Sequence, residues 1–109
     1  MENKSFDSAK VFELSKEVEY SPNGIISKRV LEKQTGNISL FSFDTDQRLS
    51  EHTAPFDAFI QVIEGTAEIF IDGTPFRVEA GGSIIMPANV PHAVYAKERF
   101  KMLLTMIKS

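Results

Sequence analysis

The chain contains two histidines and no cysteine, so His52 and His92 are the candidates for metal binding and for acid–base chemistry. Imidazole titrates near neutral pH and is a common ligand for transition metals. If the two rings meet, they could bind a divalent metal weakly, bind an anion when protonated, or act as an acid–base pair. Either ring could instead be structural, with His52 exposed before a strand and His92 buried beside a proline-rich turn. The residues alone leave these alternatives open.

Several other kinds of chemistry are excluded by what the chain lacks. Without cysteine there are no disulfides, thiolate ligands or thiol nucleophile. Neither a Gly-x-Ser-x-Gly motif nor a phosphate-binding glycine loop occurs. The net charge of -3 provides no basic surface, so no nucleic-acid partner is expected.

The sequence also predicts no membrane partner and a cytoplasmic location. The first eight residues lack the apolar core of a signal peptide, and no run of eighteen apolar residues is present.

The elements that must position the histidines are short strands separated by turn residues. They are predicted at residues 25–33, 38–43, 58–63, 66–71, 76–78, 83–86, 92–96 and 100–107. Asp72-Gly73 predicts a tight hairpin, and residues 44–51 read as a polar loop. This spacing is typical of an all-β, antiparallel sandwich or barrel.

One domain is expected at residues 24–109, with residues 1–23 packing on it as an N-terminal segment. Apolar residues within 8–18 come close to helical spacing, although the same stretch could be irregular. The strand at 38–43 is apolar on both faces and therefore needs cover on both sides. We expect a homodimer to supply part of that cover, with Phe41 at the contact.

Two stretches resemble the signature motifs of the cupin superfamily. The first carries His52 and closes on Glu64-Gly65, and the second has the spacing Gly82-x4-Pro87-x4-His92. The resemblance covers roughly residues 45–107 and implies a jelly-roll barrel, that is, an antiparallel double-stranded β-helix.

The resemblance also implies where a metal would bind. Cupins usually hold iron, manganese, nickel or zinc with three histidines and one glutamate, and His52 and His92 fall on the first and last histidine. Ala54 falls on the second histidine and Ala58 on the glutamate. A methyl group cannot coordinate, so any divalent metal is expected to bind only weakly. Asp57 could replace a missing ligand if a bulge beside Pro55 turned it inward.

Replacing two ligands by alanine is expected to leave an apolar cavity with two convergent histidines, which is typical of a small-molecule site. Strand parity predicts its lining as His52, Ile60, Val62, Met86, His92, Val94, Met102 and Leu104. Phe56 and Phe59 are placed near its mouth or at a dimer contact. A filled core without a cavity is the alternative.

These observations predict a small-molecule-binding protein with the two histidines as polar contacts. A metal-dependent enzyme of dioxygenase or isomerase type, with a substituted ligand set, is the alternative. A structural or partner-binding module with an occluded barrel is the third possibility.

Overall fold

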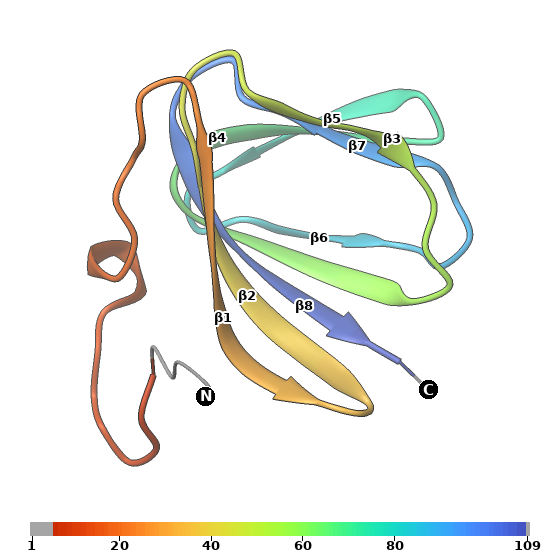
Figure 1. The fold of residues 1–109 in the computed structure, drawn as a ribbon. Helices are drawn as coiled ribbons and strands as arrows, with labels where there is room; N and C mark the ends of the chain where they lie inside the picture. The colour runs from red at the N-terminus through yellow and green to blue at the C-terminus, as the bar shows by residue number, and fades with distance from the viewer. Residues whose placement is uncertain (1–5, 109) are drawn as a thin grey trace.

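The computed structural model describes residues 6–108, and eight β-strands account for most of them (Figure 1). They are β1 (Ile25–Lys33), β2 (Gly36–Phe43), β3 (Arg48–His52), β4 (Asp57–Ile71), β5 (Thr74–Glu79), β6 (Ser83–Met86), β7 (His92–Tyr95) and β8 (Phe100–Ile107). A short 3-10 turn, η1 (Leu14–Lys16), precedes them. All pairings are antiparallel, which confirms the all-β jelly-roll prediction.

The long strand β4 closes the barrel because it takes part in both halves of the sheet. The strand order is β1-β2-β8-β4-β7-β3, with β5 and β6 also paired to β4. The first half of β4 pairs with β8 and β6, and its second half pairs with β7 and β5. The sheet therefore curls over itself, as Figure 1 shows.

The bend in β4 depends on Gly65. The register with β8 shifts between Val62 and Glu64, and Gly65 has a φ of 75°. A Cβ at this position would overlap the carbonyl oxygen of Arg99. Only glycine combines that backbone conformation with such a close approach.

The core fills the inside of the curled sheet. Phe43 and Phe100 stack with ring centroids 4.5 Å apart, and both are fully buried. Ile60, Ile69 and Met102 are buried with them. The residues next to them along each strand point to the opposite, outer face of the sheet.

Two strand predictions were wrong. Residues 44–51 were predicted to be a loop, but β3 forms there and pairs with β7. Its sequence is polar because all of it except Leu49 is exposed along the edge of the sheet. The strands predicted separately at 58–63 and 66–71 are one strand, since Gly65 bends the chain without ending it.

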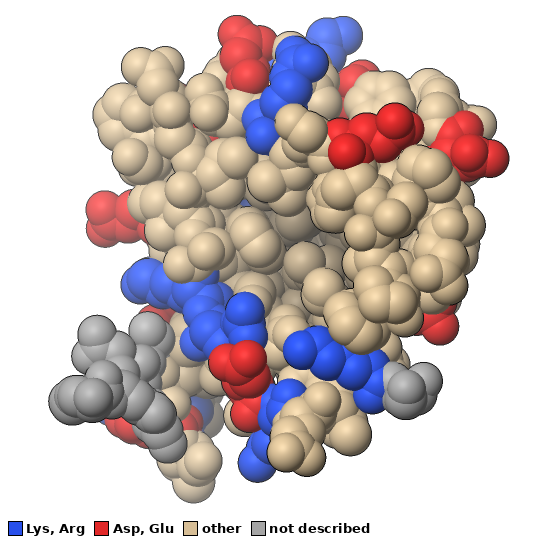
Figure 2. Space-filling model, turned by 45° about the vertical axis from the view of Figure 1, so that its right-hand side comes forward, with Lys and Arg blue, Asp and Glu red and all other residues tan. Residues whose placement is uncertain are grey.

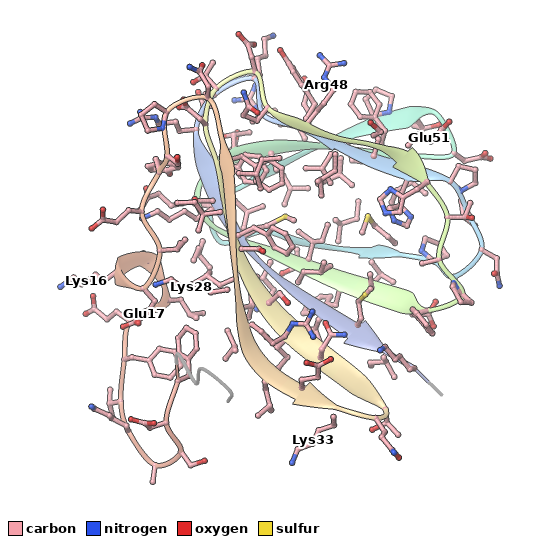
Figure 3. All side chains as sticks on the ribbon, in the orientation of Figure 1. Lys16, Glu17, Lys28, Lys33, Arg48 and Glu51 are labelled. Atoms are coloured by element: carbon pink, nitrogen blue, oxygen red, sulfur yellow. The ribbon has the colours of Figure 1, made fainter. Side chains whose placement is uncertain are left out.

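The N-terminal segment lies against the outside of β1, β2 and β8 (Figure 1). Only η1 within 8–18 is helical, so the irregular alternative holds there. Three barrel side chains donate to main-chain carbonyls of the segment: Lys28 Nζ to Glu17 (2.5 Å), Ser42 Oγ to Glu19 (2.7 Å) and Lys101 Nζ to Ser15 (2.6 Å). Figure 3 shows Lys28 directed toward the segment at Glu17. Residues 1–5, part of the predicted segment, lie outside the described residues.

This segment provides the second cover that β2 needs. Leu40 and Ser42 face it and are fully buried, whereas Phe41 packs on the opposite side against the core. The placement of Phe41 at a subunit contact was therefore wrong.

Between residues 6 and 108, no helix is long and apolar enough to cross a membrane. On the face drawn in Figure 2, acidic and basic side chains are interspersed around a largely uncharged centre.

Candidate functional site

His52 and His92 meet across two neighbouring strands. His52 ends β3 and His92 begins β7, and the two residues are register partners. Their Nε2 atoms are 3.1 Å apart. The ring centroids are 4.3 Å apart, with the planes inclined at 69°. The structure therefore places both candidate residues at one point.

Backbone carbonyls fix the proton position on each ring. The Nδ1 of His52 lies 2.7 Å from the Ser50 oxygen, and the Nδ1 of His92 lies 3.2 Å from the Val90 oxygen. A carbonyl oxygen only accepts, so these two contacts favour the tautomer that carries the ring hydrogen on Nδ1. In the neutral pair both Nε2 atoms are then acceptors facing each other. The two Nε2 atoms can be bridged only by an additional proton or by an electrophilic group that the chain itself does not supply.

Burial keeps His92 neutral. Its side chain is 7% exposed, whereas His52 lies at the surface. Burial lowers the pKa of His92 below 6.5, the Val90 carbonyl partly offsets this, and the nearby His52 charge lowers it further. Near neutral pH His92 is therefore a neutral base whose Nε2 lies against the Nε2 of His52.

A small cavity of about 60 Å³ lies beside the pair. Its lining is mostly apolar and comprises Leu49, His52, Ala54, Phe56, Ala58, Met86, His92, Val94, Met102, Leu104 and Met106. Six of the eight predicted lining residues are in this set. The other two, Ile60 and Val62, are buried in the core and do not line the cavity.

Sequence reasoning missed two lining residues. Met106 shares the inward parity of Met102 and Leu104 along β8, so the alternation of that strand could have identified it. Leu49 could not be found in the same way, because its strand was predicted to be a loop. Phe56 lines the cavity as expected near its mouth, whereas Phe59 is on the outer face.

A comparison with known protein families matches the part of the chain that carries this site. The profile of the Cupin domain family matches residues 39–107, which include both histidines and most of the barrel. The chain belongs to the cupin family.

Solved structures share this cupin fold. A conserved protein of unknown function from Streptococcus pyogenes is 40% identical with a TM-score of 0.90, covering 94% of this chain and 90% of that one. A cupin 2 conserved barrel domain protein from Leptotrichia buccalis is 41% identical (TM-score 0.86), and the match covers 89% of this chain but only 47% of that one. A cupin superfamily protein from Desulfitobacterium hafniense is 26% identical over the whole of both chains (TM-score 0.90). No protein with a curated function matches the chain.

The residues present do not fit the usual cupin metal set. Ala54 and Ala58 both line the cavity, so methyl groups occupy the two missing ligand positions. Asp57 is exposed, and its Oδ1 accepts a hydrogen bond from the Ala88 amide at 2.9 Å. Among the described residues, no three or more histidine, aspartate or glutamate side chains form a potential metal site.

Proposed function

We propose that this cupin binds a small organic molecule, with His52 and His92 as the polar contacts of the barrel cavity. The observation that carries the proposal is the meeting of two histidine rings in the lining of an apolar cavity, each ring oriented by a hydrogen bond to the backbone. An apolar cavity with a few oriented polar groups is the usual form of a ligand site.

The hydrogen-bond pattern favours a particular ligand chemistry. Both Nδ1–H groups are used by carbonyls, so the neutral pair offers only acceptors to a ligand. The complementary group is a hydroxyl or N–H donor on a small apolar body. The negatively charged oxygens of a carboxylate would face the lone pairs on the two Nε2 atoms. Binding of a carboxylate is therefore disfavoured while the rings are neutral.

Size limits the ligand further. The cavity holds about 60 Å³, whereas pockets for drug-sized ligands are roughly 300–1,000 Å³. Either the ligand is small, or only its donor end enters while the remainder lies at the exposed side of His52.

Methionine methyl signals test this proposal, because Met86, Met102 and Met106 all line the cavity. Protein labelled with ¹³C at the methionine methyls would be titrated with small alcohols and phenol, and separately with acetate, above about pH 7.5. We expect saturable shifts with the hydroxyl compounds, which His52→Ala with His92→Ala abolishes and the distant Phe76→Ala retains.

The sign of the pH dependence distinguishes a donor ligand from an anion. Protonation of Nε2 fills the acceptor, so binding of a hydroxyl compound should weaken as the pH falls below about 6. An anion would bind more tightly over the same range. Shifts with acetate alone, or none with any hydroxyl compound, would reject the proposal.

A metal-dependent cupin enzyme with a substituted ligand set is the second candidate, and one observation favours it. Histidines that bind metals commonly donate their second ring N–H to a carbonyl, as both rings do here. Two imidazoles without a third protein ligand argue against tight binding. Elemental analysis of untagged protein purified without chelator separates the candidates. About one equivalent of a transition metal, lost in the double histidine variant, would support the enzyme.

A further inference from the structure

The inward face of β8 is apolar along the strand and basic at its end. Met102, Leu104 and Met106 alternate with outward residues, and all three line the cavity. Lys108 follows at the same parity, one residue beyond the strand. Its amide donates to the carbonyl oxygen of Thr35 at 2.7 Å, which keeps this residue in line with the sheet. The row of cavity-lining residues on β8 therefore leads to an ammonium group.

Phe56 connects Lys108 to the cavity. Asp57 of β4 pairs with Ile107 of β8, so the next residues outward, Phe56 and Lys108, lie beside each other. Figure 1 shows the start of β4 next to the end of β8. The Nζ of Lys108 is 5.4 Å from the centre of the Phe56 ring, and Phe56 lines the cavity. Because an aromatic face attracts a cation, this contact holds the ammonium group at the rim of the cavity.

The charge of Lys108 is available to a ligand. The ion pairs found within residues 6–108 involve other basic residues and leave Lys108 out. Asp57 is next to Phe56, but its Oδ1 accepts a hydrogen bond from the Ala88 amide at 2.9 Å. The side chain of Lys108 is partly exposed, so an anionic group can reach it from solvent.

The two ends of the site therefore prefer different groups. The neutral histidine pair offers acceptor nitrogens, whereas the rim offers a cation. Between them the lining is apolar and includes Ala58, Met86 and Met106, which are register partners across β6, β4 and β8. A ligand that satisfies both ends has a hydroxyl group, a small apolar body and an anionic group at the opposite end.

We propose that Lys108 makes the site selective for hydroxy acids, with the hydroxyl at the histidine pair and the carboxylate at the rim. This inference rests on the proposed function and adds a specificity-determining residue to it. The opposite orientation is disfavoured, because it directs the carboxylate at the lone pairs of the Nε2 atoms. The carboxylate also stays outside the cavity of about 60 Å³, so only the hydroxyl and the apolar body need to enter.

Matched pairs of compounds test the selectivity. The pairs are n-butanol with γ-hydroxybutanoate, and para-ethylphenol with para-hydroxyphenylacetate, titrated at about pH 8 so that both rings are neutral. The methionine methyl signals give a dissociation constant for each compound. We expect each hydroxy acid to bind about two- to fivefold more tightly than its uncharged partner, as an exposed ion pair allows. The difference should disappear in about 1 M salt, where charges are screened.

Variants of Lys108 assign the selectivity to its charge. Lys108→Met should bind both members of each pair equally, and its retained binding of the alcohol shows that the site is folded. Lys108→Glu should reverse the preference, because it places a negative charge at the rim. Lys97→Met removes the same charge from an exposed position between β7 and β8 and should keep the wild-type preference.

The uncharged compounds separate failure of this inference from failure of the proposed function. If they bind but the hydroxy acids bind no more tightly, or if the preference persists in Lys108→Met, the selectivity is overturned and the ligand site stands. If no uncharged hydroxyl compound binds, the proposed function is rejected and the selectivity with it.

Discussion

His52 and His92 touch, yet their surroundings differ. His52 lies at the surface, whereas His92 is buried and has a pKa lowered below 6.5. The sequence motifs predicted that the two rings could line one pocket, because their spacing resembles that of a family whose barrel is known. The hydrogen bonds of Nδ1 to Ser50 and Val90 could not be predicted, since they depend on the backbone path around each ring.

Ala54 and Ala58, at the two missing ligand positions, allow a direct prediction about metal binding. Ala54→His with Ala58→Glu would complete a set of three histidines and one carboxylate, because both positions line the cavity beside the pair. We expect the double variant to bind cobalt(II) or zinc(II) at one equivalent, at least tenfold more tightly than the wild type.

Calorimetric titration with zinc(II) and the visible absorption of bound cobalt(II) would measure that gain. Ala88→Glu, which changes an alanine that does not line the cavity, serves as the control and should gain nothing. Failure of a folded double variant to bind metal would show that the cavity cannot place four ligands around one ion.

At the scale of elements, the strands that carry strong alternation were predicted well. β1 and β8 have the predicted bounds, and the Asp72-Gly73 hairpin forms with positive φ at both residues. β3 was missed because an exposed edge strand has almost no apolar alternation to detect. The small size of the cavity could not be predicted either, since it depends on how Phe56 and the methionines pack.

The attachment of the N-terminal segment to the sheet gives a prediction for Lys101. Its side chain is 9% exposed, donates to the Ser15 carbonyl, lies 3.6 Å from Glu64 and lies 5.0 Å from the centre of the Tyr20 ring. Lys101→Met removes the ammonium group, so the Ser15 carbonyl loses its hydrogen-bond donor and the Glu64 carboxylate loses its charged neighbour. We expect a loss of about 1–3 kcal/mol in the free energy of unfolding.

Hydrogen exchange would locate the effect of that substitution. Amides of residues 15–20 should exchange faster in Lys101→Met, while those of β5 and β7 should not change. Lys10→Met, at an exposed position of the same segment, is the control. Unchanged exchange at residues 15–20 would mean that Lys101 does not hold the segment.

For the whole molecule, the barrel separates the histidine pair from the outer face of the sheet. The cavity lies beside β3 and β7, which carry the histidine pair, whereas Ile107 of β8 is exposed on the outer face. Because Ile107 does not line the cavity, Ile107→Glu should retain the methionine shifts caused by hydroxyl compounds.

¹⁵N spectra of the histidine rings in metal-free protein test most directly the claim that the pair presents two acceptor nitrogens. Near pH 8 we expect both rings to carry hydrogen on Nδ1 with Nε2 unprotonated, and His92 to take up its proton only below pH 6.5. A proton on Nε2 of either ring near pH 8, or a pKa of His92 above 6.5, would contradict the claim.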